Sequence, residues 1–296
     1  MKIKKQYIYI IAVSIVAVLA VSLFSKGYKN SEQPTATEES KPVIKPLNIT
    51  VMLDLSNRII RNDGNQANIP QAEKDSTILM NIQKGFYKRQ YKNGMMNFTQ
   101  DKIQVICYPN PSLSNINNII SDMAVDLTIS GGPSIANNKR MLRAMEGTWS
   151  SSISSIYRQT IASSNWVGSD IWGFFAKDAE MLCVKQDHRN ILIILTDGYI
   201  QYTKNWEQTS PNVYTGILPR TVKNQTAITP TGKNYNDKLE VLFLEINPLS
   251  ARTSDFNKIE QLITSWCNGM GIKKMQVVQT NLPTHTQKYI DSFIGW

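Results

Sequence analysis

Three short polar segments, at 54–58, 168–173 and 196–198, carry the side chains that could bind a ligand. The main candidates are Asp54, Ser56, Ser169 and Asp197. Asn57 and Asp170 stand next to them and offer accessory oxygens. Hard oxygen ligands, with no thiolate or imidazole among them, suit Mg²⁺, with Mn²⁺ or Ca²⁺ as alternatives, and do not suit zinc. These residue types therefore predict a divalent-metal site, provided that the fold brings the three segments together.

The elements around these segments would bring them to one edge of a sheet. Residues 48–54 form a β-branched-rich run and residues 190–196 form the most apolar predicted strand, and each run leads to one of the two aspartates. The remaining segment, at 168–173, leads into a helix expected at 171–184, which is capped by Ser169 or Asp170. In a parallel sheet, ligands bind in the crevice beyond the carboxyl ends of the strands. All three segments should therefore line that crevice.

The rest of the globular part alternates between strand-like and helix-like patterns. Further strands are expected at 103–108, 124–129, 238–246 and 274–279. Further helices are expected at 69–91, 113–123, 135–162 (one or two helices, broken near Gly147), 256–270 and 286–295. This alternation predicts an α/β fold: a doubly wound, mostly parallel central sheet with helices on both faces. A long polar stretch at about 200–237 joins two core strands and would be an insert over the crevice.

The chain from residue 48 to its end resembles a von Willebrand factor A (vWA) domain, and the resemblance implies a Rossmann-like α/β fold. The family's metal-ion-dependent adhesion site (MIDAS) uses a DxSxS motif after the first strand, a Thr or Ser in a later loop, and an Asp after the central apolar strand. Asp54 and Ser56 match the first two motif positions, Ser169 lies in a Gly-Ser-Asp-Ile-Trp-Gly context common in bacterial members, and Asp197 follows Leu-Thr. The resemblance implies a protein-binding module, not an enzyme, in which an acidic residue of the partner completes the coordination of the metal.

Arg58 departs from the family pattern, because it holds the third position of DxSxS. A guanidinium has no lone pair to donate and repels a cation. Water, Asn57 or Asp170 would then complete the metal's shell, or the metal is absent and the fold serves only as a scaffold.

A metal-dependent hydrolase of phosphatase type is a further alternative on a similar sheet. Such an enzyme needs Asp-x-Asp after the first strand, and Ser56 stands where its second Asp should be. The sequence also has no P-loop, no nucleophile elbow and no histidine near the three segments. These features favour the binding module.

The N-terminal segment has the pattern of a membrane anchor. Three lysines precede an uncharged apolar run at 7–24, which as a helix would be about 27 Å long and could just cross the hydrocarbon core. No small-residue cleavage site ends the run, which favours an uncleaved anchor over a signal peptide. We expect residues 1–25 to form one transmembrane anchor, 26–47 a polar linker, and 48–296 an extracytoplasmic (periplasmic) domain.

Composition narrows the function classes further. Of the net charge of +9, residues 1–47 carry +4, so the globular part has no dense basic stripe and nucleic-acid binding is not expected. The three cysteines lie in apolar runs without a CxxC spacing, which predicts small buried side chains, not disulfides, a zinc site or a nucleophile. With only two histidines, a cysteine–histidine hydrolase is not expected either.

Overall fold

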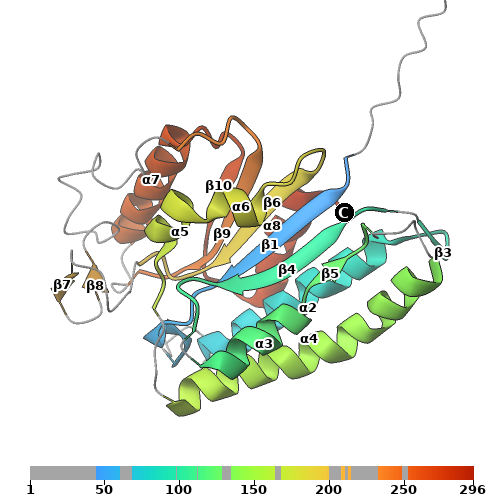
Figure 1. Ribbon diagram of the computed structural model, residues 1–296. Coiled ribbons are helices and arrows are strands. Elements are labelled where there is room, and N and C mark those ends of the chain that lie inside the picture. Colours follow the sequence, from blue (N-terminus) through green and yellow to red (C-terminus); the bar gives the residue numbers. More distant parts are fainter. Residues whose placement is uncertain are drawn as a thin grey trace, which may run out of the picture. The chain divides into compact units, whose positions relative to one another are not determined.

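A computed structural model describes residues 45–60, 69–97, 99–111, 113–128, 135–163, 168–199, 208–210, 213–214, 233–248 and 253–296 (Figure 1). The expected anchor at 7–24 and most of the expected linker lie outside these residues. Among the described residues, no helix is both long enough and apolar enough to cross a membrane. Lys45–Trp296 form one compact unit.

A six-stranded sheet is the centre of the described part. Its strands are β1 (Leu47–Leu53), β4 (Lys102–Cys107), β5 (Val125–Asp126), β6 (Arg189–Leu195), β9 (Leu239–Ile246) and β10 (Met275–Gln279). They lie in the order β10-β9-β6-β1-β4-β5, and only the edge strand β5 is antiparallel to its neighbour. The strand order reverses between β1 and β6, which makes their carboxyl ends the switch point where ligands bind in such sheets. The predicted mixed α/β fold with a mostly parallel sheet is confirmed.

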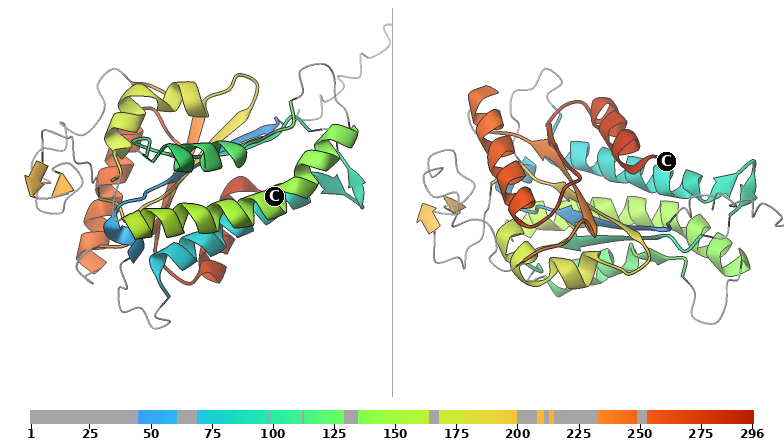
Figure 2. Two further views of the ribbon diagram at one scale, coloured as in Figure 1. Left: turned by 60° about the horizontal axis from the view of Figure 1, so that its bottom comes forward. Right: turned by 90° about the horizontal axis from the view of Figure 1, so that it is seen from above.

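Helices cover both faces of this sheet (Figure 2). One face packs against α2 (Gln71–Arg89), α3 (Ser114–Asp122), α4 (Ile135–Ser163) and α8 (Pro283–Ile294), and the other against α5 (Ile171–Lys177), α6 (Ala179–Cys183) and α7 (Thr253–Gly269). From β1, Val51 faces the first group and Met52 the second. Burial on both sides explains why the end of β1 and nearly all of β6 read as apolar runs.

Five minor elements complete the described part. A single 3₁₀ turn, η1 (Asn57–Ile60), follows β1, and β2 (Tyr91–Lys92) pairs with β3 (Met95–Met96) in a hairpin after α2. The expected insert at 200–237 contributes the antiparallel pair β7 (Gln208–Ser210) and β8 (Val213–Tyr214). Most of the remaining insert lies outside the described residues.

Two helix predictions need correction. The pattern at 171–184 forms two short helices, α5 and α6, with a slight interruption at Asp178, whose backbone N–H still donates to the carbonyl of Phe174 at 2.9 Å. The pattern at 135–162 forms one 29-residue helix, α4, which continues through Gly147. Mid-helix glycine costs only about 1 kcal/mol relative to alanine. Burial of neighbours such as Leu142, Met145 and Trp149 offsets that cost.

Gly147→Ala should therefore stabilise the chain by about 0.5–1 kcal/mol, because a Cβ there would meet nothing within 4 Å and the unfolded chain would lose conformational freedom. Urea unfolding measures the change. Gly173→Ala is the contrasting variant, since its Cβ would lie 2.2 Å from Oδ2 of Asp170 and disturb the cap of α5. Loss of stability in Gly147→Ala would contradict the packing of α4 described above.

The three cysteines are buried, as predicted, and lie in three different elements: Cys107 in β4, Cys183 at the end of α6 and Cys267 in α7. Burial raises the pKa of the Cys183 and Cys267 thiols to about 12. It also raises the pKa of Cys107, and the nearby charge of Asp54 adds to that shift. All three thiols therefore stay protonated in the folded chain.

Candidate binding site at the carboxyl edge of the sheet

The fold brings the three predicted segments to the switch point between β1 and β6. The backbone N–H of Asp54 donates to the carbonyl of Leu195 at 3.1 Å, which joins the ends of the two strands. An isolated β-bridge pairs Leu55 with Gly168 and so places Ser169 beside the loop after β1. The convergence expected from the sequence is present in the structure.

Asp54 lies at the centre of this site, with no exposed surface. Its Oδ1 accepts a hydrogen bond from the backbone N–H of Ser56 at 2.9 Å, and its Oδ2 accepts one from Oγ1 of Thr196 at 2.8 Å. Burial raises the pKa of Asp54, while the charge of Arg58 and these hydrogen bonds partly offset the rise. Both carboxylate oxygens are thus already engaged inside the chain.

Arg58 is the residue that changes the chemistry of the site. Only 2% of its surface is exposed, and its Nε lies 3.5 Å from Oδ2 of Asp54. Its Nη2 donates to Oδ2 of Asp75 at 2.6 Å and to the carbonyl of Leu195 at 2.9 Å. Burial alone would lower the pKa of Arg58, but the charges of Asp75, Asp54 and Asp197 keep it above its ordinary value. A permanent positive charge therefore sits against the carboxylate that a metal would need.

Asp75 was not predicted as a site residue. It lies on α2 and forms an ion pair with Arg58. Its Oδ2 also accepts a hydrogen bond from the hydroxyl of Tyr157 at 3.0 Å, and its Oδ1 accepts one from Nε2 of Gln71 at 2.8 Å. A signal was present in the sequence: Asp75 is three residues before Ile78, on the apolar face of the predicted helix. An acidic residue on a buried face needs a buried partner.

The other candidate residues have defined places around this centre. Oγ of Ser56 accepts a hydrogen bond from the backbone N–H of Arg58 at 3.4 Å. Asp197, which is 2% exposed, accepts one from the backbone N–H of Tyr199 at 3.1 Å. Oγ of Ser169 is fully buried, and among the described residues it has no hydrogen-bond partner.

The two accessory candidates have local roles. Oδ1 of Asp170 accepts a hydrogen bond from the backbone N–H of Gly173 at 2.8 Å and so caps α5, and burial raises the pKa of this carboxyl. Of the two cap residues considered, Asp170 therefore makes the bond and Ser169 does not. Asn57 begins the 3₁₀ turn η1 and is half-buried.

These residues do not fit a divalent cation in the expected manner. The guanidinium of Arg58 contacts Asp54 and would repel an ion bound there. In the part of the chain that the structure describes, no cluster of three or more His, Cys, Asp or Glu side chains could hold a metal ion. Among the described residues of this site, Oγ of Ser169 and Nη1 of Arg58 are both buried without a hydrogen-bond partner, which favours a further ligand.

A second buried carboxylate lies next to Asp75, at the end of β9. Glu245 is 1% exposed and has φ of 67°. Its Oε2 accepts hydrogen bonds from Thr280 at 2.6 Å and Gln71 at 3.1 Å, and its Oε1 accepts one from Thr286 at 3.1 Å. Burial raises the pKa of Glu245 and the charge of Asp75 adds to the rise. Gln71 thus links Glu245 to the ion pair of Arg58.

The raised pKa of Glu245 predicts a pH effect on stability. Because its pKa is raised, the carboxyl of Glu245 holds its proton more tightly in the folded chain than in the unfolded chain. The contribution of Glu245 to stability therefore grows as the pH falls from its folded pKa toward the ordinary value of 4.5. Relative to Glu245→Gln, the native chain should therefore gain stability on acidification from about pH 7 to about pH 5. Denaturant unfolding at each pH measures this difference. The exposed Glu146→Gln is the control. If the native chain instead lost stability relative to Glu245→Gln on acidification, the raised pKa of Glu245 would be refuted.

Comparisons with known proteins give little further information. No protein-family model matches the chain, and no curated protein matches it. A solved structure of the pilus adhesin SpaC from Lactobacillus rhamnosus GG matches at 13% identity and a TM-score of 0.41, over 85% of this chain and 30% of that one. This chain thus spans less than a third of the adhesin. At this level of similarity the match carries no inference about function.

Proposed function

We propose that this chain is a vWA-like protein-binding module, without catalytic activity, whose binding crevice lies beyond β1 and β6. The observation that carries the proposal is the convergence of Asp54, Ser169 and Asp197 at the switch point of the sheet. The six strands follow the order 3-2-1-4-5-6 when numbered along the chain, which is a doubly wound arrangement that binds ligands there.

In this proposal Arg58 supplies the fixed positive charge of the site in place of a metal. Its contacts with Asp54, Asp75 and Leu195 support this role. A form that depends on Mg²⁺, completed by a carboxylate of the partner, is the second candidate. The unpaired Oγ of Ser169 favours that form.

The hydrolase alternative is less well supported. Asp54 would be its nucleophile, but this side chain has no exposed surface and both oxygens accept hydrogen bonds. His188, one of two histidines in the chain, lies before β6 at the other end of the sheet, between the carbonyls of Gln186 and Gln100. Neither residue is placed for catalysis.

The proposal includes a membrane tether on sequence grounds alone. The apolar run at 7–24 would anchor the chain, and residues 48–296 would act outside the cytoplasm. The partner would then be a protein of the same compartment.

An exposed aromatic beside the crevice gives a direct test. Trp172 is 36% exposed, two residues from Asp170 on α5, and buried aromatic anchors dominate protein interfaces. Trp172→Ala should weaken capture of the native partner from membranes by about 30-fold, as for a hot spot worth about 2 kcal/mol. A quantitative pull-down with the full-length chain measures the change.

Tyr289→Ala, which removes a 44% exposed aromatic on α8, is the matched control. A chelator should leave capture by the native chain unchanged if Arg58 supplies the charge. Loss of capture in chelator would support the metal-dependent form instead. Equal capture by the two variants would place the interface elsewhere on the molecule.

A further inference from the structure

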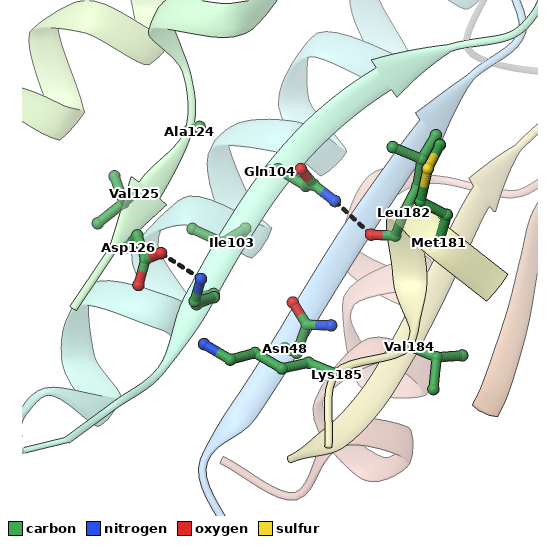
Figure 3. Close-up of a pocket in the computed structure, with 11 residues that line it drawn as sticks. Asn48, Ile103, Gln104, Ala124, Val125, Asp126, Met181, Leu182, Val184 and Lys185 are labelled. Carbon is green, nitrogen blue, oxygen red and sulfur yellow. Dashed lines mark hydrogen bonds and ion pairs between the residues drawn. The ribbon is translucent and has the colours of Figure 1, made fainter. Parts of the chain in front are cut away.

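A second candidate surface lies at the opposite end of the sheet from the crevice. It is a hollow of about 300 Å³, and its lining includes Asn48 at the start of β1 and Lys102 at the start of β4 (Figure 3). Asn48 is six residues before Asp54 along a strand, a distance of about 20 Å. The hollow is therefore separate from the site described above.

The hollow exists because α6 covers only part of its face of the sheet. The amide Nδ2 of Asn48 donates to the carbonyl of Cys183 at 3.0 Å, and Nε2 of Gln104 donates to the carbonyl of Leu182 at 2.8 Å. These bonds tie the end of α6 over β1 and beside β4 (Figure 3). Beyond them, Lys102 and Gln104 remain half-buried, whereas Ile103, on the other face, is in the core.

One rim of the hollow is apolar. Met181 is 74% exposed and Leu182 is 36% exposed, both on α6, and they stand on the opposite side of the hollow from Val125 (Figure 3). Contiguous exposed apolar surface rimmed by polar residues marks protein-interaction sites. The two α6 residues therefore offer apolar area that no described part of the chain covers.

The polar part of the lining carries an excess of positive charge. Lys102 and Lys185 both line the hollow, and Asp126 is their acidic neighbour. Asp126 pairs with Lys102, while Nζ of Lys185 makes a long hydrogen bond of 3.4 Å to Oγ1 of Thr128. Burial lowers the pKa of Lys185, and the neighbouring ammonium of Lys102 lowers it further. Within the described part of the chain, Lys185 thus forms no ion pair with a carboxylate, and its ammonium lies close to that of Lys102.

We propose that this hollow binds a peptide segment of a partner protein that presents an apolar side chain next to a carboxylate. The apolar side chain would pack on Met181 and Leu182, and the carboxylate would lie by Lys185. The charge complementarity follows from the two lysines facing one aspartate. A volume of about 300 Å³ is at the small end of ligand pockets and suits one or two side chains. This surface is independent of the proposed function at the crevice.

The test uses the full-length chain and a fluorescent capped peptide of alternating glutamate and leucine. Anisotropy should detect binding that weakens as salt is added. The same peptide with glutamine for glutamate should bind about fivefold more weakly, as should Lys185→Gln with the acidic peptide, because a partly exposed ion pair is worth up to about 1 kcal/mol. Met181→Ala should also weaken binding severalfold. The matched controls are Lys92→Gln and Met95→Ala, which alter an exposed lysine and a 72% exposed methionine of the β2–β3 hairpin.

Three outcomes would overturn the proposal. The first is no binding of the acidic peptide. The second is equal binding of the acidic and neutral peptides, or equal affinity of Lys185→Gln and Lys92→Gln. The third is displacement of the peptide by inorganic phosphate or by anionic lipid vesicles at equal charge, which would make the site a general anion site. All of these variants change partly or fully exposed residues, so circular dichroism should remain that of the native chain.

Discussion

Arg58→Ala is expected to lower the free energy of unfolding by about 3–5 kcal/mol. The substitution leaves the carboxylates of Asp54 and Asp75 buried without their shared cation. It also removes the hydrogen bond to the carbonyl of Leu195, which helps to join the ends of β1 and β6. Urea unfolding of the two chains measures the difference. Arg158→Ala, at an exposed position of α4, should change stability by no more than about 0.5 kcal/mol.

A second variant tests whether the charge of Arg58 takes the place of a metal ion. Arg58→Ser restores a hydroxyl at the third motif position, next to Asp54 and Ser56. If the guanidinium stands in for a cation, Mg²⁺ at ten times its dissociation constant should return about 1.4 kcal/mol of stability to this variant. The native chain should gain none. Equal Mg²⁺ effects on the native chain and on Arg58→Ser would contradict the role given to Arg58.

Asp75→Ala is the second substitution with a large expected effect, again about 3–5 kcal/mol of destabilisation. Asp75 accepts hydrogen bonds from Arg58, Tyr157 and Gln71, and all three donors are buried. Removing this carboxylate therefore takes an acceptor away from each of these three buried donors, and the loss of a buried hydrogen-bond partner is costly. Denaturant unfolding gives the value, and the exposed Glu73→Ala on the same helix is its control.

Coupling between the two positions tests whether they act as one unit. The double variant Arg58→Ala, Asp75→Ala should cost less than the two single effects added together, by about 1–3 kcal/mol, because each single change already breaks the shared ion pair. Strictly additive effects would show that Asp75 does not stabilise Arg58, which would then be held by Asp54 and the carbonyl of Leu195.

The sheet could be predicted from the sequence because its central strands are buried on both faces. Such strands must be continuous apolar runs, and the strand expected at 190–196 is one, observed as Arg189–Leu195. The meeting of the Asp54 and Asp197 segments followed from the same pattern, since neighbouring parallel strands end at one edge. Local sequence therefore sufficed for the backbone of the site.

The side-chain chemistry of the site could not be predicted in the same way. The resemblance to the vWA motif predicted a ligand at the position of Arg58, but the partner of Arg58, Asp75, lies on a helix 17 residues later. That pairing depends on how α2 packs against the sheet, which no local pattern encodes. The continuity of α4 could not be predicted from local sequence either, because the burial of Trp149 and its neighbours outweighs the weak helix propensity of Gly147.

The burial of the three thiols links their reactivity to the opening of the fold. A thiol reacts as its thiolate, and these side chains are protonated and closed off from solvent. Alkylation or oxidation must therefore wait until the element that holds the cysteine separates from its neighbours. Since β4, α6 and α7 each carry one of them, the order in which Cys107, Cys183 and Cys267 are modified reports which of these elements separates first.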